Sequence, residues 1–216
     1  MSTAPGDGGF VADLGSLSTS GISDALDRLG LDGQCQGIKP IDRSCALVGR
    51  PVADGAAPGT VGDYIDDLGP GDVVVLDNRG RLDATVWGDL LTFTAARRQV
   101  AGTVIDGVCR DVGRALAFAY PIFSRGSWMR TGKDRVRVEA IGEPVSIGGV
   151  RVESGDYLVG DGDGIVVIPA RRAAEVAGVA AEIEAAEAKI RQAVEAGASL
   201  REARAAVNYH QLQARR

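Results

Sequence analysis

The chain has 216 residues, 45% of them hydrophobic and 25% charged, with a formal net charge of −5. This length and composition favour one large globular domain. The acidic balance excludes the basic surface that replaces counterions on a phosphate backbone, so we expect no nucleic-acid partner.

The cysteines and the N-terminus indicate the cellular compartment. Cys35, Cys45 and Cys109 lack CxxC spacing, which disfavours both a disulfide framework and a thiolate zinc site. The first ten residues lack the basic start and apolar run of a signal peptide, and no apolar stretch approaches about 18 residues. We therefore expect a cytoplasmic protein that does not enter a membrane.

Hydrophobic periodicity and turn residues predict the elements in chain order. Residues 1–17 look loosely ordered, and the hydroxyls at 18–20 offer N-caps for a helix that Gly30 ends. The following patterns alternate between helix and strand, and they give strands 45–48, 52–53, 73–76, 103–106 and 122–123 and helices 61–68, 88–100 and 112–119. This rhythm is typical of an α/β fold.

The C-terminal third changes character. Short strands separated by Gly-rich turns are predicted at 145–147, 150–152, 157–159 and 165–168, followed by a long Ala/Glu-rich helix at 171–195 and a second helical piece at 200–207. We therefore predict a flexible N-terminus (1–17), an α/β domain (18–170) and a helical extension (171–216) that packs on the domain or on a neighbouring subunit.

Two short segments carry the chemistry. Asp89 follows Gly88 at a predicted helix start, and Arg110 with Asp111 follows a buried strand. Two carboxylates and a guanidinium at one rim would suit a hard cation and a small carboxylate substrate. The alternatives are that Asp89 is only a helix cap and that Arg110 with Asp111 is only a surface ion pair.

Main-chain donors add to this site. The amides of Leu90 and Leu91 would lie in the first helical turn, where unpaired N–H groups could hold a carboxylate or an enolate oxygen.

Other candidate residues have simpler structural explanations. The glycine-rich run 160–164 reads as a hairpin turn, Cys109 as a small buried residue, and the single histidine, His210, excludes a multi-histidine metal site.

Four segments together resemble a known family. They are residues 88–91, 102–111, 121–126 and 160–169, within a likeness that covers about residues 18–200. The chain is similar to the family of the regulator of ribonuclease activity A (RraA-like). This family includes the class II 4-hydroxy-4-methyl-2-oxoglutarate/4-carboxy-4-hydroxy-2-oxoadipate aldolases.

The resemblance implies a single-domain β/β/α swivelling-type fold with a long C-terminal helix, assembled as a homotrimer or homohexamer. It implies that Asp111 binds magnesium or manganese directly, that Asp89 holds metal-bound water, and that Arg110 binds the substrate and helps to activate a water. Main-chain groups of Gly88, Leu90 and Leu91 would contact the pyruvate part. Glu187 is the candidate for a glutamate supplied by an adjacent subunit.

One position departs from the family pattern. The aldolases usually have an acidic residue three positions after the Arg-Asp pair, where this chain has Arg114. A cation there would repel the metal, or it would favour a more anionic substrate.

The leading hypothesis is a divalent-metal-dependent carbon–carbon lyase on small 2-oxo acids. It would cleave a 4-hydroxy-2-oxo acid to pyruvate by a retro-aldol reaction, or decarboxylate oxaloacetate. One alternative is a non-catalytic binding protein that regulates a ribonuclease or helicase, and another is a specialised lyase of a biosynthetic pathway.

Overall fold

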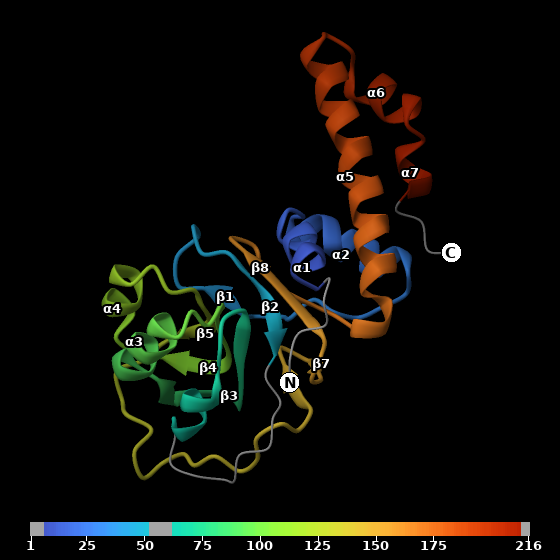
Figure 1. Cartoon of the computed structure of the whole chain (residues 1–216). Coiled ribbons are helices and arrows are strands. Elements are labelled where there is room, and N and C mark those ends of the chain that lie inside the picture. The colour runs from blue at the N-terminus through green and yellow to red at the C-terminus, as the bar shows by residue number, and fades with distance from the viewer. Residues whose placement is uncertain (1–6, 52–61, 213–216) are drawn as a thin grey trace. The chain divides into compact units, whose positions relative to one another are not determined.

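The structure is a computed structural model that describes residues 7–51 and 62–212 (Figure 1). It confirms the mixed α/β fold with a long C-terminal helix. The strands are β1 (Lys39–Pro40), β2 (Leu47–Pro51), β3 (Asp72–Trp87), β4 (Gly102–Cys109), β5 (Ile122–Ser127), β6 (Val145–Ile147), β7 (Val150–Val152), β8 (Tyr157–Asp161) and β9 (Gly164–Ile168). The helices are α1 (Asp7–Gly15), α2 (Thr19–Arg28), α3 (Asp89–Arg97), α4 (Val112–Ala117), α5 (Ala173–Glu195), α6 (Leu200–Ala206) and α7 (Tyr209–Leu212), with 3₁₀ turns η1 (Asp63–Asp67) and η2 (Ala170–Arg172).

Backbone contacts divide the chain into two compact units. Residues 34–170 form one unit, and the N-terminal helices group with the helices after residue 170 in the other. Helix α2 therefore belongs with the C-terminal helices, whereas the sequence placed it in the 18–170 domain. Within the described chain, no helix is both long enough and apolar enough to cross a bilayer.

The helical unit is joined by charged side chains as well as apolar packing. Ser18 caps α2 by accepting from the Gly21 N–H at 3.1 Å, as the hydroxyl run predicted. Glu184 of α5 accepts in turn from the Ser18 hydroxyl at 2.7 Å. Arg28, nearly buried, pairs with Glu182 of α5 at 2.8 Å. These bonds fix α2 along α5.

The loosely ordered segment expected at 1–17 needs correction in part. Residues 7–15 form helix α1, and Leu14 is fully buried. The glycines and acidic residues of this stretch have low helix propensity, but burial of an apolar side chain overrides such preferences. Residues 1–6 lie outside the described chain, as do the predicted strand at 52–53 and the first residue of the predicted helix at 61–68. Within that predicted helix, the 3₁₀ turn η1 covers 63–67.

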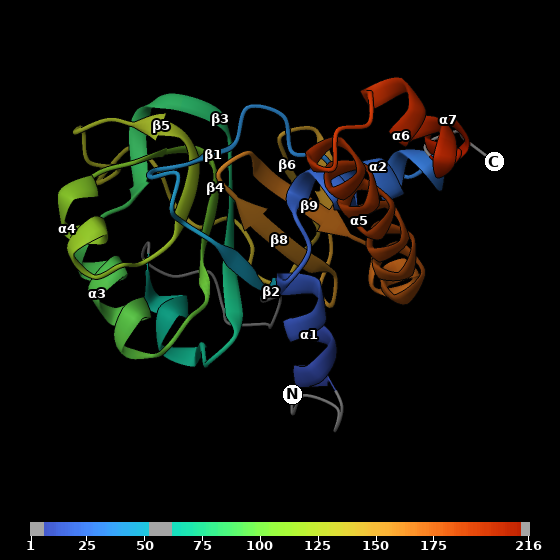
Figure 2. The same cartoon turned by 90° about the horizontal axis from the view of Figure 1, so that it is seen from above.

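The α/β unit contains a seven-stranded sheet in the order β1-β5-β4-β3-β2-β8-β9. Strands β2, β3, β4 and β5 run parallel, while β1, β8 and β9 pair antiparallel to their neighbours. The hairpin β6-β7 is separate. Figure 2 shows α3 and α4 beside the parallel strands.

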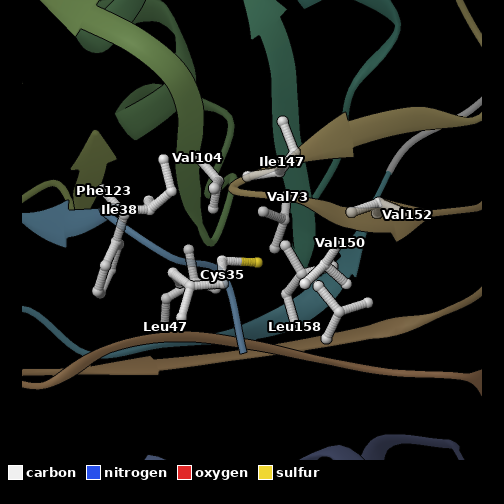
Figure 3. Packing of buried hydrophobic residues seen from close by; sticks show 12 residues of the cluster. Cys35, Ile38, Leu47, Val73, Val104, Phe123, Ile147, Val150, Val152 and Leu158 are labelled. Carbon is white, nitrogen blue, oxygen red and sulfur yellow. The ribbon is translucent and has the colours of Figure 1, made fainter. Parts of the chain in front are cut away.

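Alternate residues of the central strands face two apolar clusters. Val73 and Val104 pack in one cluster with Ile147 of β6 (Figure 3), while Val74 and Ile105 pack in the other beneath α3 and α4. Because both faces of the sheet are covered, the sequences of these strands are nearly continuous apolar runs. Strand β3 extends far beyond the predicted 73–76, and register shifts accompany its positive-φ residues Arg79 and Gly80.

One acid lies inside this unit. Asp106 is 6% exposed, accepts hydrogen bonds from the Arg125 guanidinium and, at 2.8 Å, from the Gly148 N–H. Gly148 has φ +56, and an added Cβ would lie 2.7 Å from the Gln36 backbone, so this turn requires glycine. Burial raises the pKa of Asp106, but the bonds from Arg125 and Gly148 outweigh it and hold the pKa below its ordinary value. The pair thus ties β4 to β5 and to the β6-β7 turn.

Removing this buried charge should destabilise the fold. We expect Asp106→Asn to lower the free energy of unfolding by about 2 kcal/mol, because the buried carboxylate loses its charge-assisted bonds while the Arg125 side chain, 30% exposed, stays partly solvated. Urea unfolding at pH 7 measures the change. Asp83→Asn is the matched control, since its pair with Arg81 is exposed, and it should cost less than about 1 kcal/mol.

The same pair predicts a pH dependence. Because folding lowers the pKa of Asp106, its contribution is complete above the unfolded-state pKa of about 3.9 and is lost as pH falls through the lower folded-state pKa. The stability difference between the wild type and Asp106→Asn should therefore shrink below about pH 4. A difference that stays constant from neutral to strongly acidic pH would contradict this account.

Candidate functional site

The predicted site lies where two parallel strands end. Trp87, the last residue of β3, pairs with Cys109, the last residue of β4. The Arg110 N–H also donates to the Trp87 carbonyl at 3.0 Å. In open α/β sheets, this carboxyl edge is where ligands bind. The segments that follow β3 and β4 therefore leave the sheet at the same place, so residues 88–89 and 110–111 become neighbours.

The predicted side chains converge. The Oδ2 atom of Asp111 accepts from the Asp89 N–H at 3.1 Å and lies 3.2 Å from Nε of Arg110. The side chains of Arg110 and Asp111 are each 37% exposed, so they are anchored but open to solvent. The expected proximity is thus present in the structure, while the chemical roles of these residues stay predictions.

Asp111 owes its direction to an unusual backbone. It occupies the N-cap position of α4 with φ +58 and ψ 35, the left-handed region, and its side chain makes no cap bond to α4. Such a conformation costs a non-glycine residue about 1–2 kcal/mol, less for Asp than for most. Its carboxylate reaches α3 instead. The reading of Arg110 with Asp111 as only a surface ion pair therefore omits its bond to the Asp89 amide.

Gly88 makes room for this arrangement. It is the N-cap of α3 and has extended φ and ψ angles, so its backbone does not need glycine. A Cβ here would lie 3.0 Å from both Nε of Arg110 and Oδ2 of Asp111. A larger residue would push both site side chains away, so space is the reason for glycine at this position.

The main-chain donors need one correction. The Leu90 N–H, expected to be unpaired, donates to Oδ1 of Asp89 at 2.9 Å, because the short Asp side chain folds back over the first helical turn. Asp89 is the first residue of α3, and its N-cap is Gly88. The first intrahelical bond of α3 runs from the Thr92 N–H to the Gly88 carbonyl at 3.0 Å. The Leu91 amide lies before that bond, as expected for a helix start.

The donor set suits a hydrated metal ion. Within residues 7–51 and 62–212, no three His, Cys, Asp or Glu side chains gather as a metal cage. The Asp111 carboxylate contacts the Asp89 backbone instead, which brings two acidic residues to one place. Each has one carboxylate oxygen for which no bond to a described residue is found, Oδ1 of Asp111 and Oδ2 of Asp89. Magnesium and manganese accept one or two carboxylates and keep several waters. The residues present fit such an ion.

Several other candidates can be placed. Burial raises the pKa of Cys109, whose Sγ lies 3.7 Å from the Gly126 carbonyl, so the plain reading of a buried thiol holds. The 160–164 run is the tight turn between β8 and β9, where Asp161 pairs with Gly164. Arg114 is the third residue of α4; its N–H donates to the Asp111 carbonyl at 2.9 Å, and its side chain is exposed.

Glu187 lies on α5 in the helical unit. It accepts from the Tyr209 hydroxyl at 2.9 Å and lies 3.5 Å from Arg191. Burial and this bond raise the pKa of Tyr209. The role of Glu187 at a neighbouring subunit's site stays a prediction.

Cavity size alone would point elsewhere. A cavity of about 1020 Å³ is lined by β3, the 134–145 segment and Tyr64, and it contains none of the predicted site residues. The convergent charged groups make the better candidate site, because ligand binding needs placed polar groups as well as volume. Two polar features were missed in the sequence: the Asp106–Arg125 pair and a buried bond from the Trp87 indole to Thr92. A lone acid inside the apolar run 102–109 was the available signal for the first.

Comparison with known proteins matches this architecture. The family model described as RraA-like, Aldolase/RraA, matches residues 19–167. Protein DlpA of Legionella pneumophila is 37% identical over 210 residues, which cover 94% of this chain and 34% of DlpA. The chain therefore spans about a third of that relative's length.

Two further proteins resemble most of the chain. A Halalkalibacterium halodurans protein, provisionally named as a 4-hydroxy-4-methyl-2-oxoglutarate aldolase, is 36% identical over 163 residues, 74% of this chain and 76% of that protein. The crystal structure of an uncharacterized protein from Pseudomonas syringae pv. tomato superposes with a TM-score of 0.83 at 38% identity, over 91% of this chain and 97% of that one. The chain belongs to the RraA-like family.

Proposed function

We propose that the protein is a divalent-metal-dependent carbon–carbon lyase that acts on small 2-oxo acids. It would release pyruvate from a 4-hydroxy-2-oxo acid, or decarboxylate oxaloacetate. The observation that carries the proposal is the contact of Asp111 with both the Asp89 N–H and Arg110 at the carboxyl edge of the sheet. The provisional aldolase name of the Halalkalibacterium relative supports the reaction class.

Asp111 and Asp89 would hold magnesium or manganese, Asp111 directly and Asp89 through water. When bound, such an ion polarises a keto oxygen and stabilises the negative charge that develops as the carbon–carbon bond breaks. Oδ1 of Asp111 and Oδ2 of Asp89 could bind the ion or its water while the other carboxylate oxygens keep the bonds that anchor these side chains. Homotrimeric or homohexameric assembly, with Glu187 supplied by a neighbour, remains part of the proposal.

Arg110 would bind and orient the substrate carboxylate. Its Nε contacts Asp111, and no bond from its two terminal nitrogens to a described residue is found. A planar guanidinium edge suits a carboxylate. The N-terminus of α3 lies beside it and favours negative charge. The site therefore offers two positive features to a small anionic substrate.

Removing the metal-binding carboxylate should abolish turnover. We expect Asp111→Ala to lower pyruvate release from oxaloacetate at least about 100-fold and to remove Mn²⁺ binding measured by calorimetry, because the only direct ligand is lost. Asp163→Ala, in the β8-β9 turn, is the matched carboxylate deletion and should leave both unchanged.

A chelator should stop the wild-type reaction. Turnover that persists with chelator, or in Asp111→Ala at the wild-type rate, would remove the proposal. A wild type that binds no Mn²⁺ and turns over neither substrate would favour the alternative of a binding protein that regulates a ribonuclease or helicase.

Arg114 should weaken metal binding in this chain. Its N–H donates to the Asp111 carbonyl and its side chain is exposed, so it adds a positive charge three positions after the carboxylate that would bind the metal. We expect Arg114→Glu to strengthen Mn²⁺ binding by roughly threefold to tenfold at low salt, with a smaller gain at high salt because of screening. Arg97→Glu, at the far end of α3, makes the same change in net charge. Equal gains in the two variants would show an effect of net charge alone.

A further inference from the structure

Two consecutive peptide units connect β3 to the site. The first joins Trp87 to Gly88, and its carbonyl accepts from the Arg110 N–H at 3.0 Å. The second joins Gly88 to Asp89, and both of its polar ends are bonded. Its carbonyl accepts from both the backbone N–H and the hydroxyl of Thr92, each at 3.0 Å. Its N–H donates to Oδ2 of Asp111 at 3.1 Å.

The planarity of the peptide links these two bonds. In a trans peptide, the carbonyl and the N–H of one unit point in opposite directions within one plane. Whatever fixes the Gly88 carbonyl therefore fixes the direction of the Asp89 N–H. The Thr92 hydroxyl acts on one end of the unit while the Asp111 carboxylate receives the other.

The Thr92 hydroxyl is itself directed by a buried indole. Trp87 and Thr92 are each 1% exposed, and Nε1 of Trp87 donates to Oγ1 of Thr92 at 2.9 Å. The Trp87 ring stacks on Tyr120 with centroids 6.2 Å apart and planes at 9°. A hydroxyl has a single proton, so accepting from the indole leaves that proton for the Gly88 carbonyl.

We infer that Thr92 is a positioning residue, which holds the Gly88–Asp89 peptide so that its N–H anchors the Asp111 carboxylate. The inference rests on the proposed function for its catalytic meaning, but the peptide arrangement can be tested without any activity. Thr92 acts through the backbone and touches neither substrate nor metal.

Helix α3 contains its own control. Two residues further along the helix, Thr94 makes the same kind of bond, from its hydroxyl to the Leu90 carbonyl at 2.9 Å. No indole bond to Thr94 is found in the described chain. The Thr92→Val and Thr94→Val variants therefore delete the same group from the same helix. Only the Thr92 deletion removes a bond to the Gly88–Asp89 peptide, whose N–H donates to Asp111.

The first measurement is hydrogen exchange of the Asp89 amide, resolved by NMR. We expect this amide to exchange about tenfold faster in Thr92→Val, as for the loss of one anchoring hydrogen bond. Thr94→Val should leave the rate within about twofold of wild type, which is less than one such bond. Thr92→Ser keeps the hydroxyl and should restore the wild-type rate.

The second measurement is Mn²⁺ affinity, followed by calorimetry alongside thermal unfolding and the separate kcat and KM for oxaloacetate. A supporting residue behind a metal ligand typically changes affinity about 10–100-fold, so Thr92→Val should fall in that range and Thr92→Ser near wild type. If Thr92→Val does not fold, Trp87→Phe is the second variant. It removes the indole that directs the Thr92 hydroxyl but keeps the hydroxyl, so it should change Asp89 exchange and Mn²⁺ affinity in the same direction as expected for Thr92→Val, by a smaller factor.

The outcomes separate the two ideas. A lower Tm in Thr92→Val with unchanged Asp89 exchange and Mn²⁺ affinity overturns the inference, because Thr92 would then be merely structural. Equal changes in Thr92→Val and Thr94→Val also overturn it. A wild type that neither binds Mn²⁺ nor turns over defeats the proposed function, while the Asp89 exchange rates still decide whether Thr92 holds the peptide.

Discussion

Parallel pairing of β3 with β4 is the constraint on which the site depends. Because the two strands run in the same direction and end opposite each other, at Trp87 and Cys109, the loops that follow them must emerge together. Asp89 and Asp111 are 22 positions apart in the chain, yet the backbone of one meets the carboxylate of the other. No local sequence preference could achieve this, since the contact is a property of the sheet register.

That register is in turn protected by chemistry inside the sheet. Asp106 is the only charged residue of β4, and its acceptor capacity is met by groups from β5 and from the β6-β7 turn. Sliding the strand would leave a carboxylate in an apolar layer without those donors, which is far costlier than misplacing one aliphatic side chain. Apolar runs alone specify such a register weakly, because Val and Ile fit either face.

The sequence allowed the site to be predicted because its residues stand at element ends, where Gly88 and a buried apolar run mark the boundaries. It also indicated most helices and the four short C-terminal strands. What escaped prediction depends on distant partners. The Asp106–Arg125 pair joins different strands, and the bond from Trp87 to Thr92 looks like ordinary helix packing in the sequence.

Local patterns also misled in two places. The predicted strand stopped at residue 76, yet β3 continues through 77–80 with a change of register, since pairing with β4 compensates for the irregular backbone. The Leu90 amide looked free because helix starts leave donors unpaired, but a neighbouring carboxylate within the same turn took it. Neither outcome follows from propensities, because each is decided by which acceptor happens to lie nearest.

Under the proposed function, the left-handed backbone of Asp111 would set thermal stability against activity at a single position. Glycine would relax the conformation, and asparagine tolerates it about as well as aspartate does, but neither supplies the anionic oxygens. A laboratory selection that rewards heat resistance alone would therefore favour these residues, and on the proposed function the selected protein would be more stable but inactive. Aspartate in a left-handed conformation is a local strain of the kind that proteins keep at functional sites, which agrees with the role proposed for Asp111.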